Sequence, residues 1–146
     1  MEIIKAGYNN KHPGDFKVIR ETGSEFHLLL VIKTSAYIVL NGEMRIVPPN
    51  SVIIYKAGTP QFYGASDDEY INDWVYFDMP EDEYDKYLTD GICFDTIFPS
   101  VYVSEMSSLI KRIFTEYFSQ NKYKDNSCTL YMEIVFLKLA ETLNMD

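Results

Sequence analysis

The sequence predicts a mainly β fold, either a sandwich or a closed barrel, followed by α-helices. Within about 60 residues, short apolar or alternating runs recur between turn residues, which is typical of closely spaced strands rather than of alternating β/α units. Asn41-Gly42 lies between two such runs and is a strong hairpin signal, because both residues tolerate a positive φ. After Phe77 the apolar residues recur at intervals of three and four, which indicates helices.

The predicted strands are the runs bounded by Gly, Pro, Asn and other turn residues. The run 26–33 is almost continuously apolar, so we expect a core on one of its faces and a covering element on the other. Residues 1–15 have turn residues and little periodicity, which predicts an irregular arm, either an unstructured end or a flap over the barrel mouth. The predicted strands cover residues 16–20, 26–33, 36–40, 43–47, 52–55 and 61–63, with a last aromatic strand around Trp74.

The helical part begins with a short helix from Pro80 to about Thr89, whose first turn is acidic. Ser104 is a candidate N-cap for a longer helix, and a polar break follows at residues 121–126. Ser127 begins another helix, which is apolar on two sides. One side can therefore pack on the strands and the other on a partner.

The length of 146 residues fits one domain, which we divide into four segments. The chain ends while the last helix still has helical periodicity, so we expect that a C-terminal part of the protein is absent from this sequence. The segments are an N-terminal arm (1–15), a barrel (16–79), a short helix with a connection (80–103) and a helical dimerisation segment (104–146).

The composition excludes several function classes. The net charge of -9 and the scattered Lys and Arg residues disfavour contact with a nucleic-acid backbone by this segment alone. Cys93 and Cys128 have no paired spacing, and we interpret both as reduced, buried, small apolar residues. No run approaches the roughly 18 apolar residues of a membrane span, and the N-terminus has no signal pattern. We therefore expect a cytoplasmic protein without membrane contact.

Catalytic chemistry has little support in this sequence. The two histidines, His12 and His27, cannot form a usual metal site unless many carboxylates converge on them. We interpret His27 as a hydrogen-bonded strand residue and His12 as a surface residue. The sequence has no nucleophile elbow and no phosphate-binding loop. We accordingly expect no metal, no cofactor and no enzymatic activity.

The alternation of side chains along the predicted strands indicates candidate binding residues, because successive side chains point to opposite faces of a sheet. Gln61 shares a face with Tyr63, and Asn72 shares one with Trp74. If these faces line a barrel, they form an aromatic pocket with a few fixed amides and hydroxyls, which suits a small polar molecule. Arg20 can bind hydroxyls or a carboxylate, and Trp74 can stack on a sugar ring. Alternatively, Arg20 is a solvated surface residue, Trp74 belongs to the core, and the amides satisfy one another.

A family resemblance rests on the run PPNSVIIYKAGTPQFYG and the subsequent INDWVYF. Together with the predicted helix pair, these segments resemble the N-terminal domains of AraC-type transcription regulators. The resemblance implies a cupin-like jelly-roll barrel that binds an effector, followed by helices that dimerise. It also implies a C-terminal DNA-binding domain with two helix-turn-helix units, which this sequence does not include.

The resemblance also assigns residues. Arg20 matches a sugar-contacting arginine, Trp74 a stacking tryptophan and Tyr63 a pocket tyrosine. Gln61 and Asn72 stand where the arabinose-binding member of the family has histidines. The resemblance therefore implies a pocket of the same type that is lined by different polar side chains. The resemblance further implies a dimerising or packing stripe at Leu130, Ile134 and Leu137.

The expected function is therefore a sensing and dimerisation domain of a transcription regulator. Its expected partners are a small polar effector, a carbohydrate in the first place, and a second copy of the chain in a homodimer. Contact with DNA is expected only through the missing domain. Two alternatives remain open: a small cupin enzyme such as a sugar isomerase or epimerase, and a pure dimerisation module whose barrel is packed shut.

Overall fold

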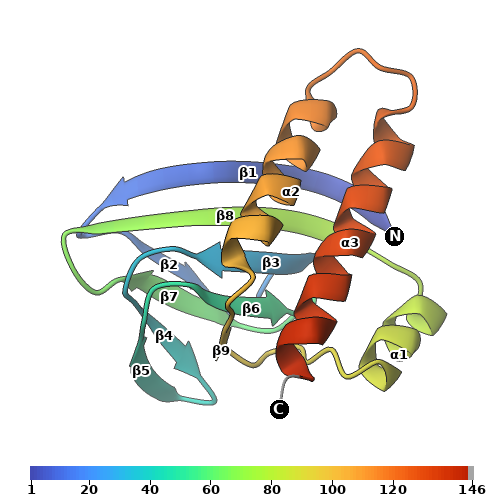
Figure 1. Ribbon diagram of the computed structural model, residues 1–146. Coiled ribbons are helices and arrows are strands. Elements are labelled where there is room, and N and C mark those ends of the chain that lie inside the picture. Colours follow the sequence, from blue (N-terminus) through green and yellow to red (C-terminus); the bar gives the residue numbers. More distant parts are fainter. Residues whose placement is uncertain (145–146) are drawn as a thin grey trace.

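Two antiparallel sheets face each other, and two long helices pack on the outer face of one of them (Figure 1). The computed structural model describes residues 1–144. The five-stranded sheet has the order β1-β8-β3-β6-β9, and the four-stranded sheet has the order β2-β7-β4-β5. The strands are β1 (Glu2–Pro13), β2 (Lys17–Arg20), β3 (His27–Ile32), β4 (Ala36–Leu40), β5 (Glu43–Val47), β6 (Ser51–Tyr55), β7 (Gln61–Ala65), β8 (Glu69–Asp78) and β9 (Phe98–Pro99).

The interior consists of two apolar clusters on opposite faces of the five-stranded sheet. Strand β3 contributes to both, because its side chains alternate. Leu28 and Leu30 belong to the inner core between the sheets, whereas Leu29 and Val31 belong to the outer core under the helices. The expectation that this apolar strand is covered on both faces is therefore confirmed.

The helices are α1 (Glu81–Thr89), α2 (Val103–Tyr117) and α3 (Lys124–Leu143). Helix α2 begins one residue before Ser104, with Tyr102 at the N-cap position, so the predicted Ser104 cap is wrong. Helix α3 begins inside the predicted polar break. In the turn before it, Asn121 Oδ1 accepts a hydrogen bond of 2.9 Å from the Tyr123 amide. Residues 145–146 of the predicted helical segment lie outside the described residues.

The prediction of an irregular N-terminal arm is wrong. Strand β1 forms an edge of the five-stranded sheet and pairs with β8 from Glu2 opposite Asp78 to Pro13 opposite Glu69 (Figure 1). Register shifts between Ile3 and Lys5 and between Gly7 and Asn10 interrupt the alternation of side chains. Local periodicity therefore does not reveal this strand, whose partner lies far away in the sequence.

The predicted fold class, mainly β with helices after the strands, is confirmed. The strands form two sheets around the inner core, and the architecture does not require a closed barrel. Among residues 1–144, no helix has the length and apolar character needed to cross a membrane.

Candidate ligand-binding site

A pocket of about 390 Å³ opens on the inner face of the two sheets. Its base is formed by the apolar side chains of Leu28 and Leu30 on β3. Aromatic rings form much of its wall and leave a few polar groups between them. The aromatic lining residues are Phe16, Tyr63, Trp74 and Tyr76. This combination of an apolar base with a few polar groups is typical of small-molecule sites.

The structure brings four of the five predicted ligand-binding residues to this pocket: Arg20, Tyr63, Asn72 and Trp74. Gln61 does not line it. This residue is fully buried beside the pocket, and its Oε1 accepts a hydrogen bond of 2.7 Å from Arg20 Nη1. The bond follows from the register of β2 and β7, which places Arg20 opposite Gln61. Gln61 therefore orients the arginine.

Tyr63 has a phenol that stays protonated at neutral pH. Burial raises its pKa to about 12, and the neighbouring Arg20 only partly opposes this shift through its charge and a hydrogen bond. The hydroxyl of Tyr63 can therefore act as a hydrogen-bond donor toward the pocket.

Asn72 lines the pocket with a buried amide whose acceptor is unpaired within the described part of the chain. The side chain is 4% exposed, and its Nδ2 donates a hydrogen bond of 3.1 Å to the Tyr70 hydroxyl. Its Oδ1 has no hydrogen-bond partner among residues 1–144, and the same holds for Gln61 Nε2 and the Tyr55 hydroxyl. Buried polar atoms are usually satisfied by protein, water or a ligand, so the unpaired oxygen of Asn72, a lining residue, favours a polar ligand in the pocket.

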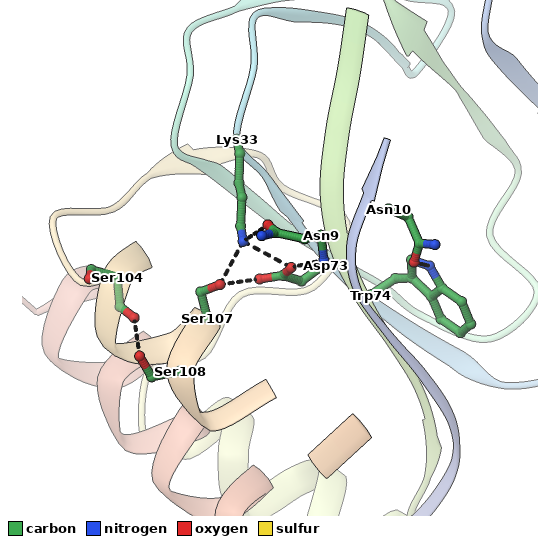
Figure 2. A network of polar contacts seen from close by, with 8 residues as sticks. All are labelled: Asn9, Asn10, Lys33, Asp73, Trp74, Ser104, Ser107 and Ser108. Atoms are coloured by element: carbon green, nitrogen blue, oxygen red, sulfur yellow. Dashed lines mark hydrogen bonds and ion pairs between the residues drawn. The ribbon is translucent and has the colours of Figure 1, made fainter. Parts of the chain in front are cut away.

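Strand β1 supplies a wall of the pocket that sequence reasoning did not foresee. Trp74 Nε1 donates a hydrogen bond of 2.8 Å to Asn10 Oδ1 (Figure 2). Gly7 lies opposite Trp74 in the pairing, and a Cβ atom on Gly7 would come within 2.2 Å of the indole ring. Only glycine therefore permits the tryptophan to lie across β1.

Lys5, His12 and Phe16 are among the lining residues that the predicted ligand-binding set did not include. His12 is half-buried and stacks on Phe16 at 3.9 Å between ring centroids, so its interpretation as a surface residue is wrong. Lys5 lies opposite Tyr76 and His12 opposite Tyr70. Only the register between β1 and β8 places both residues in the pocket, and the sequence pattern did not reveal that register.

The opposite face of β8 carries a buried ion pair (Figure 2). Asp73 is fully buried and lies 3.0 Å from Lys33 Nζ. Ser107 of α2 donates a hydrogen bond of 2.6 Å to Asp73 Oδ2, and the Asn9 amide donates one of 2.7 Å to Asp73 Oδ1. Lys33 also donates to Ser107 and to Asn9. These contacts join β1, β8 and α2 to the end of β3.

A larger recess of about 760 Å³ lies beside this ion pair, on the outside of the sheets near the start of α2. Among residues 1–144, its one charged lining residue is Lys33, which Asp73 already neutralises. The lining of the inner pocket combines aromatic rings, Arg20 and Asn72, whose Oδ1 has no hydrogen-bond partner among residues 1–144. We therefore assign the candidate site to the inner pocket.

Metal-binding side chains do not cluster in the described part of the chain. Within residues 1–144, no group of three or more His, Cys, Asp and Glu residues is placed to hold a metal ion. His27 lies outside the pocket, and its Nδ1 accepts a hydrogen bond of 2.9 Å from the Ala57 amide. The interpretation of His27 as a hydrogen-bonded strand residue is confirmed.

Comparison with known families identifies the domain. Residues 6–139 match the model of the AraC-like ligand binding domain. The chain belongs to this family. The resemblance noted in the sequence is thereby confirmed, and the pocket lies in a domain type that is defined by ligand binding.

Solved structures support the same fold. ToxT from Vibrio cholerae is 11% identical, with a TM-score of 0.57; the match covers all of this chain and 59% of that chain. The AraC-like transcriptional activator CuxR is 9% identical with a TM-score of 0.55, and the match covers 83% of this chain and 44% of that chain. The chain therefore spans about three fifths or less of the length of these two structures. No curated protein matches the chain in sequence.

Proposed function

We propose that this domain binds a small polar effector, a carbohydrate, in the inner pocket and acts as the sensing and dimerisation part of a transcription regulator. The observation that carries the proposal is the convergence of Arg20, Tyr63, Asn72 and Trp74 on one hollow. These residues come from three different strands, β2, β7 and β8. Convergence of polar groups and a tryptophan from separate strands is what ligand recognition requires.

Each of these residues has a chemical role in the proposal. Trp74 presents an aromatic face against which the C–H edge of a sugar ring can pack. Asn72 Oδ1 accepts a hydrogen bond from a sugar hydroxyl, and the protonated Tyr63 donates one. Arg20, held by Gln61, offers its remaining N–H groups to oxygen atoms of the ligand.

Two substitutions test the pocket. A thermal-shift screen of monosaccharides, including L-arabinose, first selects a stabilising sugar. Calorimetry with that sugar should then show affinity reduced about tenfold or more in Arg20→Ala, since a hydrogen bond with a charged partner is lost. Trp74→Ala should weaken binding as well. Lys17→Ala, on the opposite face of β2, is the matched control and should bind normally.

Unchanged affinity in both pocket variants would show that the pocket is assigned wrongly. A module packed shut would respond to no sugar in the screen. The pocket of about 390 Å³ already argues against that alternative, because a closed core leaves no such space. The enzyme alternative has no specific observation in its favour, and the family is one of ligand-binding domains.

Dimerisation is proposed through helix α3. Its buried side packs on the outer core, whereas Leu130 and Leu137 on the other side are 60% and 62% exposed. Ile134 lies between them at helical spacing and is 41% exposed. An exposed stripe of three large aliphatic side chains favours a protein contact.

The dimer proposal predicts a change in mass. Leu130→Glu combined with Leu137→Glu should convert a dimer into a monomer in sedimentation velocity, because burying carboxylates in an apolar contact is costly. Leu88→Glu, at an exposed position of α1, is the control and should leave the mass unchanged. A wild-type domain that sediments as a monomer at all concentrations would contradict the proposal.

Regulation in this proposal depends on differential affinity. The effector changes the balance between two arrangements of the protein only if it binds one of them more tightly. With a net charge of -9 the domain repels a phosphate backbone, so DNA contact is assigned to another domain of the regulator. A gel-shift experiment with the isolated domain should accordingly show no DNA binding.

A further inference from the structure

The charge of the pocket lining differs from that of the chain as a whole. The sequence has 22 acidic and 13 basic residues. Nevertheless, among residues 1–144 the pocket is lined by Lys5 and Arg20 and by no carboxylate. The hollow is thus positive in an otherwise acidic protein, which attracts an anion.

Both cations are available to a ligand. Within residues 1–144, neither Lys5 nor Arg20 forms an ion pair, whereas Lys11, Lys33 and Lys138 each have a carboxylate within 4 Å. Arg20 donates Nη1 to Gln61 and also bonds to Tyr63, which leaves further N–H donors on its guanidinium. Both partners are neutral, so they orient the guanidinium without neutralising it.

The positions of the cations suit a ligand between the sheets. Lys5 comes from β1 of the five-stranded sheet and Arg20 from β2 of the four-stranded sheet. Lys5 Nζ lies 5.9 Å from the centroid of the Trp74 ring. A ligand that approaches Trp74 therefore meets a cation at the aromatic ring, and among residues 1–144 Asn72 Oδ1 has no hydrogen-bond partner that would compete with a ligand hydroxyl.

We propose that the ligand of this pocket is an acidic carbohydrate, either a sugar acid or a sugar phosphate, whose anionic group contacts Lys5 and Arg20 while its ring packs on Trp74. This inference rests on the proposed effector-binding function and specifies its ligand class. A neutral sugar leaves both cations without a counter-charge, whereas an anionic group forms charge-assisted hydrogen bonds with them. The pocket charge therefore selects against neutral sugars of the same shape.

The single tryptophan provides the readout. Because Trp74 lines the pocket, its fluorescence should change when a ring packs on it. Titrations should compare D-galacturonate with D-galactose and D-glucose 6-phosphate with D-glucose. We expect at least one acidic sugar to bind about tenfold or more tightly than its neutral counterpart, the margin of a charge-assisted hydrogen bond. The pair that responds distinguishes a carboxylate ligand from a phosphate ligand.

Matched variants assign the selectivity to the two cations. Lys5→Met should lose about tenfold in affinity for the acidic sugar, and Lys5→Arg should retain most of it. Lys17→Met, which removes a positive charge from the opposite face of β2, should bind as the wild type does. Loss of affinity in Lys17→Met equal to that in Lys5→Met would overturn the inference, because a general change in net charge would then explain the effect.

Other outcomes separate this inference from the proposed function. Equal or tighter binding of a neutral sugar would overturn the anionic ligand class and leave the effector pocket in place. Failure of all four sugars to bind would overturn the inference and, with it, the carbohydrate part of the proposed function.

Discussion

Trp74 is positioned from two sides by β1. Asn10 accepts its N–H, and Gly7 leaves the space in which its ring lies. The orientation of the ring is therefore set by the protein before a ligand arrives, which reduces the entropy lost on binding. Arg20 is prepared in a similar way by Gln61. At the scale of single residues, the pocket is preorganised by neighbours that do not all line it.

His27 has a buried environment that depends on its charge state. Its Nδ1 accepts the Ala57 amide, and the rings of Phe77, Tyr84 and Phe94 lie close to it. Burial lowers the pKa of His27 below its ordinary value of 6.5, although the carboxylates of nearby acidic residues oppose the shift. The folded protein therefore holds a neutral imidazole.

This environment predicts a loss of stability in mild acid. As the pH falls below about 6.5, the unfolded chain binds a proton at His27 more readily than the folded chain, so the free energy of unfolding decreases. Thermal melting between pH 7.5 and pH 5.5 (about one unit on either side of the ordinary histidine pKa) should show this slope. His27→Gln should make the slope shallower. An identical slope in both proteins would contradict the assignment.

Successive side chains of β8 alternate between the pocket and the face that the helices cover. Asn72 and Trp74 face the pocket, whereas Asp73 between them faces the helices and bonds to Ser107 of α2. Both faces also contact the β1 bulge, where Asn9 bonds to Asp73 and Asn10 to Trp74 (Figure 2). At the scale of elements, one short stretch of β8 and β1 thus carries the pocket wall and the attachment of α2.

The ion pair under α2 predicts a large effect of one substitution. Asp73→Ala should lower the free energy of unfolding by about 3 kcal/mol, because Lys33 is then left without its counter-charge. The double variant Asp73→Leu with Lys33→Met should recover much of that loss. Ser107→Ala, which removes one hydrogen bond, should cost about 1 kcal/mol. Urea unfolding measures all three, and a loss in Asp73→Ala no greater than in Ser107→Ala would show that the ion pair contributes little.

The accessibility of the two cysteines depends on how the whole molecule packs. Cys128 is buried where α3 packs on α2, and its thiol donates to the Ile113 carbonyl at 3.6 Å. Burial raises the pKa of Cys128 to about 11. Cys93 is exposed in the connection after α1, so the expectation that both cysteines are buried is wrong for Cys93. The two thiols therefore differ in both access and reactivity.

Thiol labelling should separate them. In the native protein at neutral pH, Cys93 should react rapidly with an aromatic disulfide reagent, whereas Cys128 should react only when the helix pair opens. A Cys93→Ser variant isolates the slow reaction, and denaturant should accelerate it. Labelling of Cys128 in this variant at the rate of a free thiol would contradict the packing of α3 on the outer core.

Local sequence determined the elements whose partners or turns lie nearby. Strands β4 and β5 coincide with the predicted runs 36–40 and 43–47, because Asn41-Gly42 sets the hairpin and both residues lie close in sequence. The alternation of side chains also put Asn72 and Trp74 on one face of their strand and Gln61 and Tyr63 on one face of theirs, because a period of two needs no knowledge of the partner strand. The packing of the sheets decides that Tyr63, Asn72 and Trp74 line one pocket. The helix pair and the family resemblance were likewise visible in the sequence.

Only the tertiary structure decided the role of β1 in the pocket and in the attachment of α2. Its pairing with β8 joins residues more than 50 positions apart, and two register shifts hide its alternation from local analysis. Lys5 and His12 enter the pocket, and Asn9 reaches Asp73, only through that register. The face on which a side chain lies is a local property of a strand, but the neighbours it meets depend on how distant strands align.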